Sequence, residues 1–211
     1  MQKLLTEFVG TLLFLFAIEL AVARAGDLTP LVIGCALMTM VYMGGHVSGA
    51  HYNPAVSLAV LLRGKMTGGE FVQYSTAQIL GATVGCLLAV FATGQSFAPA
   101  PGEGVGTGAA LLVEIVFTFA LALVVLNVAT AKATSGNSYY GLAIGFTIVV
   151  AAFAGGKISG GAFNPAVGIG STVVHAMRGG GSFSHLWLYL VGPLAGGALA
   201  ALVFHAQGQK D

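Results

Sequence analysis

The sequence predicts an all-α membrane protein with six transmembrane helices and two re-entrant half-helices arranged in an inverted repeat. Three observations support this fold class. Only 7% of the 211 residues are charged, whereas about a quarter are charged in a typical soluble domain. Apolar runs long enough to cross a membrane recur along the chain, and residues 44–56 recur in similar form at 155–167.

The apolar runs give the number of crossings. A helix of roughly 20 residues spans a hydrocarbon core about 30 Å thick. Two shorter runs, residues 55–62 and 166–177, would reach only about half that distance, so we interpret them as half-helices. The six longer runs are residues 4–22, 31–43, 71–93, 109–129, 140–154 and 186–204.

Composition also limits the function classes. The net charge of +1 provides neither a basic face for nucleic acid nor an acidic tail. Cys35 and Cys86 lie in apolar runs without metal-binding spacing, so we interpret both as core thiols. Because the few polar residues include no nucleophile paired with a base and no phosphate loop, we expect no enzymatic activity, no cofactor and no metal.

The two halves of the chain repeat one another. Residues 44–56 align without gaps with residues 155–167, at an offset of 111 (164 − 53), and eight of the thirteen positions are identical. We therefore expect a single domain over residues 1–211, with repeat one at about 1–100 and repeat two at about 105–211.

Three crossings per half make the second half enter the membrane from the opposite side, so the repeats are inverted and the half-helices point at each other. The distribution of cationic residues favours a cytoplasmic location for both termini, and we expect the cell (inner) membrane. In that orientation Lys3, Arg63, Lys65, Lys132 and Lys210 lie inside, and Arg24, Lys157 and Arg178 lie outside.

Each half-helix follows an Asn-Pro-Ala triplet. Asn caps exposed backbone N–H groups and Pro fits a first helical turn, so one triplet alone is an ordinary helix start. Two triplets at equivalent places predict a functional pair, because opposed helix N-termini repel cations and admit neutral solutes. We expect both Asn amides to donate hydrogen bonds to a passing oxygen. The triplets are Asn53, Pro54 and Ala55, and Asn164, Pro165 and Ala166.

The backbone before each Asn must be irregular, and irregular backbone at this depth must be packed by protein or line water. We therefore expect its carbonyl groups to form a ladder of acceptors along a pore, with glycine at positions 49, 160 and 161 permitting the tight turns. The carbonyls belong to Gly49, Ala50, His51 and Tyr52 on one side, and to Gly160, Gly161, Ala162 and Phe163 on the other.

Glu7 and Glu114 are the ionisable residues that we identify within the spans, where a charge costs about 2.5–3.5 kcal/mol on insertion scales. We expect backbone N–H groups of the two loops to be their partners, which makes them loop-supporting carboxylates. The alternative is that each carboxylate reaches a membrane interface. We interpret His46 and His51 as structural residues of the first loop, and His175, His185 and His205 as interface residues.

Together these features resemble the major intrinsic protein family, the aquaporins and aquaglyceroporins, over essentially the whole chain. The resemblance implies a right-handed bundle of six tilted helices plus two half-helices, assembled in the lipid bilayer as a homotetramer with one pore per subunit. It also implies an outer constriction, or selectivity filter. Carried over by spacing from the two triplets, its four positions are Ile33, Ala152, Gly161 and Val167.

Strict water channels similar to this chain have an aromatic residue, a His, a small residue and an Arg at those positions. Here only the small residue is kept, so a wider and more apolar opening is expected. Family members with Val in the Arg position, such as some plant vacuolar and bacterial arsenic-linked channels, suggest ammonia, urea, hydrogen peroxide, polyols and neutral or methylated metalloids as permeants. Lys157 either restores a cation near the outer mouth or reaches solvent.

The leading interpretation is a passive channel for water and small uncharged solutes. An ion-coupled secondary transporter is the alternative, because inverted repeats and broken helices are also typical of that class. Such a transporter would keep a carboxylate or a base at the midplane, and we identify none near Asn53 or Asn164. A junctional or scaffold protein is a third possibility, without direct support in the sequence.

Overall fold

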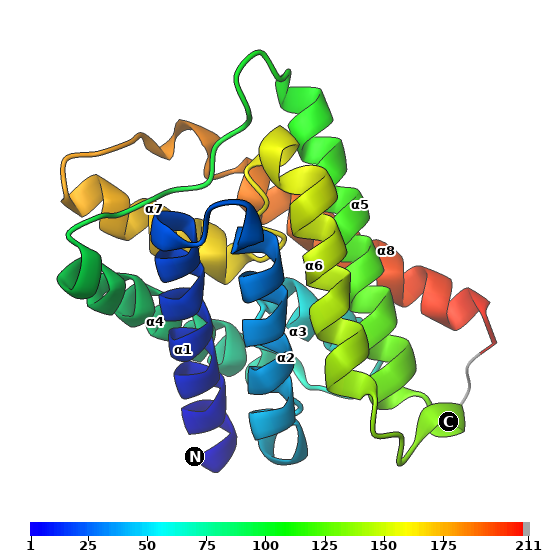
Figure 1. Cartoon of the computed structure of the whole chain (residues 1–211). Helices are drawn as coiled ribbons and strands as arrows, with labels where there is room; N and C mark the ends of the chain where they lie inside the picture. Colours follow the sequence, from blue (N-terminus) through cyan, green and yellow to red (C-terminus); the bar gives the residue numbers. More distant parts are fainter. Residues whose placement is uncertain (209–211) are drawn as a thin grey trace.

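The computed structural model of the protein describes residues 1–208, and within that range the chain folds into eight α-helices without strands (Figure 1). Lys210, counted above among the inner cations, lies outside the described residues. The helices are α1 (Gln2–Arg24), α2 (Thr29–Ser48), α3 (Pro54–Leu62), α4 (Gly68–Thr93), α5 (Thr107–Val125), α6 (Tyr140–Ser159), α7 (Pro165–Met177) and α8 (Leu188–Ala206). A short π-helix, η2 (Leu126–Thr130), extends α5.

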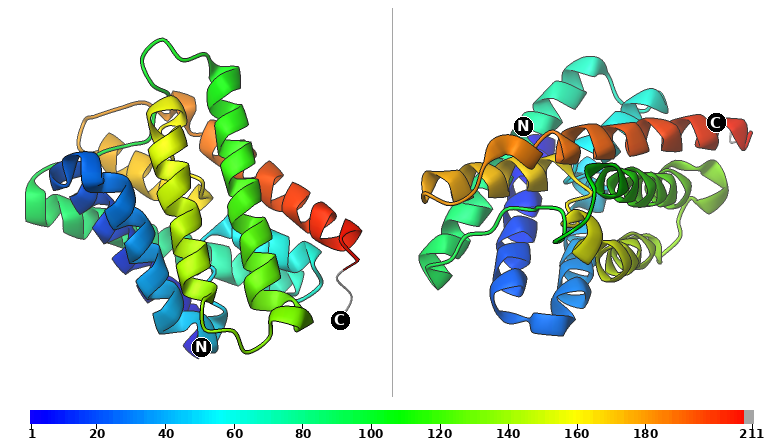
Figure 2. Two further views of the ribbon diagram at one scale, coloured as in Figure 1. Left: turned by 45° about the vertical axis from the view of Figure 1, so that its right-hand side comes forward. Right: turned by 90° about the horizontal axis from the view of Figure 1, so that it is seen from above.

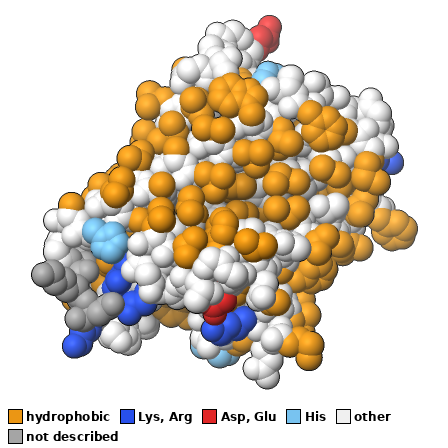
Figure 3. Space-filling model, turned by 180° about the vertical axis from the view of Figure 1, so that it is seen from behind, with side chains coloured by type: hydrophobic (Ala, Val, Ile, Leu, Met, Phe, Trp, Pro, Cys, Tyr) orange, Lys and Arg blue, Asp and Glu red, His pale blue; other side chains and the backbone are white. Residues whose placement is uncertain are grey.

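Six helical segments of the described chain are long and apolar enough to cross a membrane. They correspond to the six predicted runs, and α3 and α7 correspond to the two predicted half-helices. Hydrophobic side chains cover the middle of the face shown in Figure 3. Phe91 is 90% exposed and Leu202 is 65% exposed, which is unfavourable in water and ordinary in lipid. The predicted fold class is therefore confirmed.

Small residues let the helices approach closely. Within each half the first and last long helices pack together, α1 on α4 and α5 on α8, while α2 packs on α6 across the halves. At the α2–α6 contact, a Cβ on Gly34 would lie 2.6 Å from the carbonyl oxygen of Gly145. Close backbone approach at small residues is a common way to join helices in membranes.

Helices α2 and α6 run further than predicted, which shortens both irregular loops. The sequence placed the ends of these spans at residues 43 and 154, whereas the helices end at Ser48 and Ser159. Gly44 lies within α2 against the Tyr52 side chain, where a Cβ would overlap the hydroxyl group, so only glycine fits there. The helices end where Gly49 and Gly160 adopt left-handed conformations, with φ of 89° and 94°.

Residues 94–106, called the linker below, connect α4 to α5 without regular helix. The linker crosses the end of the bundle at which α1 and α6 terminate (Figure 2). The N-terminus and the connection from α5 to α6 lie at the opposite end (Figure 1).

Candidate pore at the paired half-helices

The two Asn-Pro-Ala triplets begin helices α3 and α7 in the same way. The Oδ1 atom of Asn53 accepts a hydrogen bond from the N–H of Ala55 at 2.8 Å. The Oδ1 atom of Asn164 accepts from the N–H of Ala166 at 2.9 Å. Each asparagine is thus an N-cap with Pro in the first helical turn. Because the cap engages the oxygen, the NH2 group of each amide must point away from its own helix.

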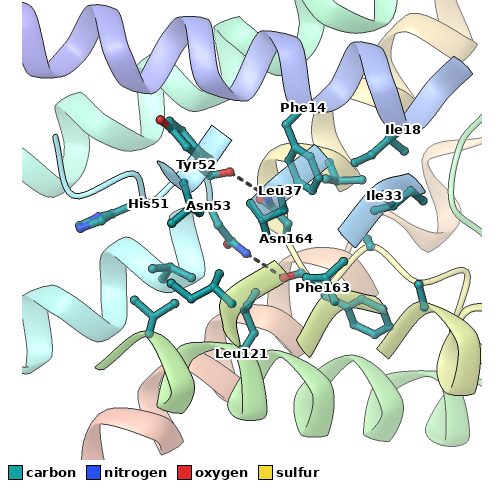
Figure 4. A pocket seen from close by; sticks show the side chains of 18 of the residues that line it. Phe14, Ile18, Ile33, Leu37, His51, Tyr52, Asn53, Leu121, Phe163 and Asn164 are labelled. Atoms are coloured by element: carbon teal, nitrogen blue, oxygen red, sulfur yellow. Dashed lines mark hydrogen bonds between the residues drawn. The ribbon is translucent and has the colours of Figure 1, made fainter. Parts of the chain in front are cut away.

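Each amide binds the loop of the other repeat. Asn53 Nδ2 donates to the carbonyl oxygen of Phe163, and Asn164 Nδ2 donates to the carbonyl oxygen of Tyr52, both at 2.9 Å (Figure 4). An amide has two N–H hydrogens, so one hydrogen on each asparagine remains for a solute. The carbonyls of Tyr52 and Phe163, both in the predicted ladder, also hold the opposite amide, which the sequence analysis did not foresee.

Both loops hold residues in the left-handed region at matching positions. Tyr52 has a φ of 48° and Phe163 has a φ of 51°, while two residues earlier in each loop Ala50 has 50° and Gly161 has 67°. Residues with side chains adopt such angles only when surrounding contacts fix them, at a cost of about 1–3 kcal/mol each. The contacts that fix these loops should therefore be specific and buried.

Glu7 of α1 provides those contacts in the first repeat. Its carboxylate accepts hydrogen bonds from the backbone N–H of His51 at 3.0 Å and of Tyr52 at 2.8 Å. It also accepts from the Ser48 hydroxyl at 2.6 Å and from Gln78 Nε2 at 2.8 Å. Four donors around one buried carboxylate compensate for its removal from water.

Glu114 of α5 binds the corresponding loop atoms in the second repeat, but no donor corresponding to Gln78 is seen among the described residues. It accepts from the N–H of Ala162 at 3.1 Å, from the N–H of Phe163 at 2.7 Å and from the Ser159 hydroxyl at 2.7 Å. Glu7 and Glu114 are both 0% exposed. The alternative that these carboxylates reach a membrane interface is therefore wrong.

One cavity contains both capping asparagines and all four predicted filter positions. Ile33, Ala152, Gly161 and Val167 line it together with Asn53 and Asn164. Most of the remaining lining is apolar, including Phe14, Ile18, Leu37 and Leu121 (Figure 4). The predicted carbonyl residues Ala50, His51, Tyr52, Ala162 and Phe163 also line the cavity, whereas Gly49 lines a second cavity and Gly160 contacts the linker.

His51 has a position that the sequence analysis underestimated. It is a base beside Asn53, it lines the cavity, and its Nδ1 lies 3.0 Å from the Ser57 hydroxyl. His46 lies on helix α2 and is exposed, so its assignment to the loop was wrong. Lys157 is also exposed and does not line the cavity.

The other histidines and the cysteines take up varied positions. His175 Nδ1 lies 3.0 Å from the Ser96 hydroxyl, and His205 Nε2 lies 3.2 Å from the carbonyl oxygen of Leu62. His185 is exposed. Cys86 is buried as expected, whereas Cys35 is only partly buried.

A third buried carboxylate was missed. Glu19 of α1 is 4% exposed and lies inside the predicted span 4–22. The signal was present, since an acid within a span needs partners. The search considered acids that occur in both repeats. Glu19 has no acidic counterpart, because the spacing that relates Glu7 to Glu114 places Leu126 at the corresponding position of the second repeat.

The second cavity opens at the end of the bundle that holds the N-terminus. It is lined by residues of α2, of η2 and of the connection to α6, and Val41 and Ile144 line both cavities. The two cavities are thus adjacent. The basic side chains at its wall are His46, Lys65 and Lys132.

The sequence profile described as "Major intrinsic protein" matches residues 1–204. The chain belongs to the major intrinsic protein family. It is 39% identical to "Aquaporin TIP2-3" of Arabidopsis thaliana, over 97% of this chain and 86% of the relative. It is 34% identical to "Aquaporin NIP1-1" of Oryza sativa subsp. japonica, over 97% and 73% respectively.

Two further comparisons cover at least 96% of this major intrinsic protein. It is 35% identical to "Glycerol uptake facilitator protein-like 6" of Lactiplantibacillus plantarum, over 100% of both chains. The X-ray structure of the aquaglyceroporin from Plasmodium falciparum superposes with a TM-score of 0.87 at 24% identity, covering 96% of this chain and 94% of that one. This last likeness shows the fold.

Family membership decides the coarse function. Major intrinsic proteins are channels rather than enzymes, so the chain is an integral, multi-pass membrane channel for water and small solutes. The predicted family and the prediction that the chain is not an enzyme are confirmed on this ground.

Proposed function

We propose that the pore passes between Asn53 and Asn164 and then through an outer filter of Ile33, Ala152, Gly161 and Val167. The observation that carries this proposal is the single cavity that contains all six residues. The four filter residues have aliphatic side chains or, at Gly161, no side chain, so we expect the filter to admit solutes larger than water. The expected permeants are ammonia, urea, hydrogen peroxide, polyols and neutral or methylated metalloids.

The chemistry of the lining explains why the permeants are uncharged. A solute that leaves water loses hydrogen bonds, and the free amide hydrogens of Asn53 and Asn164 replace part of them. Helices α3 and α7 both begin beside these asparagines, and the N-terminus of each helix contributes about half a positive charge. No acidic side chain within residues 1–208 lines the cavity to offset that charge for a cation.

The names of the relatives fit permeation both by water and by larger neutral solutes. Two of them are named aquaporins and one is named a glycerol uptake facilitator. We further propose that this channel is one domain built from two repeats, at about 1–100 and 105–211. It would have both termini in the cytoplasm, lie in the cell membrane and assemble as a homotetramer.

Stopped-flow measurements on proteoliposomes test the filter. Val167→Arg introduces both bulk and charge at the filter, and Val167→Leu is the matched control that adds bulk alone. We expect Val167→Arg to reduce glycerol, urea and arsenite flux more than water flux, with Val167→Leu giving a smaller change. Equal reductions for every solute would refute the assignment of Val167 to the filter.

The same vesicles separate a channel from an ion-coupled transporter. We expect solute flux to rise linearly with concentration and to ignore proton and sodium gradients. Saturating flux that depends on either gradient would support the transporter instead. His51 would then be the first candidate for the coupling site, because it is the base in the described lining.

A further inference from the structure

Glu19 joins four parts of the molecule although it does not line the pore cavity. Its Oε1 accepts a hydrogen bond from the Ser171 hydroxyl of α7 at 2.8 Å and a weaker one from the Cys86 thiol of α4 at 3.6 Å. Its Oε2 accepts from the backbone N–H of Phe97 in the linker at 3.3 Å. One carboxylate of α1 thus binds α4, α7 and the linker.

The contact with α7 bears directly on Val167. Ser171 follows Val167 by four residues in the same helix, and side chains four residues apart lie on one face. A rotation of α7 about its axis would therefore move both side chains together. By holding Ser171, Glu19 fixes the direction in which Val167 faces the cavity.

The contact with the linker bears on Gly161, a second residue of the filter. Beyond Phe97, the linker packs against Gly160, where a Cβ would lie 2.6 Å from both the N and the O atoms of Ala100. The N–H of Gly102 donates to the carbonyl oxygen of Ile158 at 3.0 Å. The linker therefore packs against the backbone that leads into Gly161.

An acidic residue in this span needs a reason, because a hydrophobic residue costs far less there. The second repeat has Leu126 at the corresponding spacing, so the acid is not required by the helix itself. Glu19 instead has one partner in α7, the helix that carries Val167, and one in the linker, which packs against Gly160.

We propose that Glu19 is a positioning residue for the outer filter. It holds Val167 through Ser171 and holds Gly161 through the linker, and so it limits the width of the pore. The inference rests on the proposed function, since it assumes that these residues form the filter. Loss of the carboxylate lets the linker and the Gly161 backbone recede, so larger solutes gain more than water does.

The test uses the ratio of glycerol to water permeability in proteoliposomes containing the full chain. We expect Glu19→Gln to raise that ratio by about threefold, equivalent to about 0.7 kcal/mol. Ser171→Ala should raise it by less, because the linker contact remains. Ser75→Ala is the matched control, since the buried Ser75 hydroxyl has no hydrogen-bond partner in the described structure, and it should leave the ratio unchanged.

Hydrogen exchange provides a second measurement on the same proteins. The amide of Phe97 loses its carboxyl acceptor in Glu19→Gln, so the peptide that contains it should exchange faster than in wild type, and Ser171→Ala should leave it protected. Wild-type exchange at this peptide in Glu19→Gln overturns the linker contact. If the Glu19→Gln protein does not insert into the vesicles, the comparison of Ser171→Ala with Ser75→Ala decides. An equal glycerol-to-water permeability ratio in these two variants would then overturn the proposal.

Each permeability outcome has a distinct meaning. A merely structural Glu19 would lower water and glycerol flux in proportion, because fewer channels would fold, and the unchanged ratio would overturn the proposal. A lower ratio would overturn it as well. If wild type conducts neither solute, it is the proposed channel function that fails.

Discussion

Replacing Glu114 by Gln should leave one buried backbone N–H group without an acceptor. The two oxygens of Glu114 accept hydrogen bonds from the Ser159 hydroxyl and from the N–H groups of Ala162 and Phe163. The two N–H groups bind different oxygens. A glutamine amide keeps only one acceptor oxygen, so in either orientation its NH2 group faces one of these donors.

The magnitude follows from the number of unpaired groups. A buried donor without a partner costs about 1–3 kcal/mol, so Glu114→Gln should lower the free energy of unfolding by about that amount. Glu114→Ala leaves both N–H groups unpaired and should cost about 2–6 kcal/mol. The larger loss is a substantial share of the roughly 5–15 kcal/mol that stabilises a typical native protein.

Reversible unfolding in mixed micelles, with SDS as the denaturant and helicity as the signal, measures both variants. Glu103→Gln is the matched control, because Glu103 is an exposed carboxylate of the linker. The reasoning predicts the order Glu103→Gln, Glu114→Gln, Glu114→Ala from most to least stable. If Glu114→Gln unfolds at the same SDS fraction as Glu103→Gln, the carboxylate does not hold the loop as described.

Two further predictions concern the backbone and the side chain of Tyr52. Asn164→Asp keeps the cap oxygen but turns the group that faces the Tyr52 carbonyl into an acceptor, so water flux and thermal stability in detergent should both fall; wild-type values for both would contradict the importance of this hydrogen bond. Gly10→Ala places a Cβ inside the Tyr52 ring, whereas nothing lies within 4 Å of a Cβ at Gly69. Size-exclusion profiles after heating should therefore show Gly10→Ala losing its folded peak at a lower temperature than Gly69→Ala, and equal midpoints would argue against tight packing at Gly10.

The spans and half-helices could be predicted because lipid demands long apolar runs, a property that is visible in the sequence. The ends of α2 and α6 could not. Glycine pairs such as Gly44-Gly45 usually weaken a helix, but here Gly44 serves a packing contact inside α2, since a Cβ would overlap the Tyr52 side chain. That contact joins residues of different local structure, and no local pattern reports it.

The candidate filter was implied by the resemblance to the family and located by counting from the two triplets, and its four residues do line one cavity. Its role in selectivity stays a prediction. The exchange of hydrogen bonds between Asn53 and Asn164 and the opposite loops could not be foreseen, because it depends on how closely the loops meet. Glu19 could have been found from its place in a span, but a search for symmetric pairs does not find an acid present in one half alone.

Because Asn53 and Asn164 each donate a hydrogen bond to the loop of the other half, the conformation of each loop depends on the other half of the chain. A fragment containing only the first half would have an asparagine without its carbonyl partner and a Tyr52 carbonyl without its amide. Such a half could form this centre only by meeting a second copy head to head. A substitution at one asparagine should likewise disturb the loop more than a hundred positions away in the sequence, so variation at these two places is expected to be correlated.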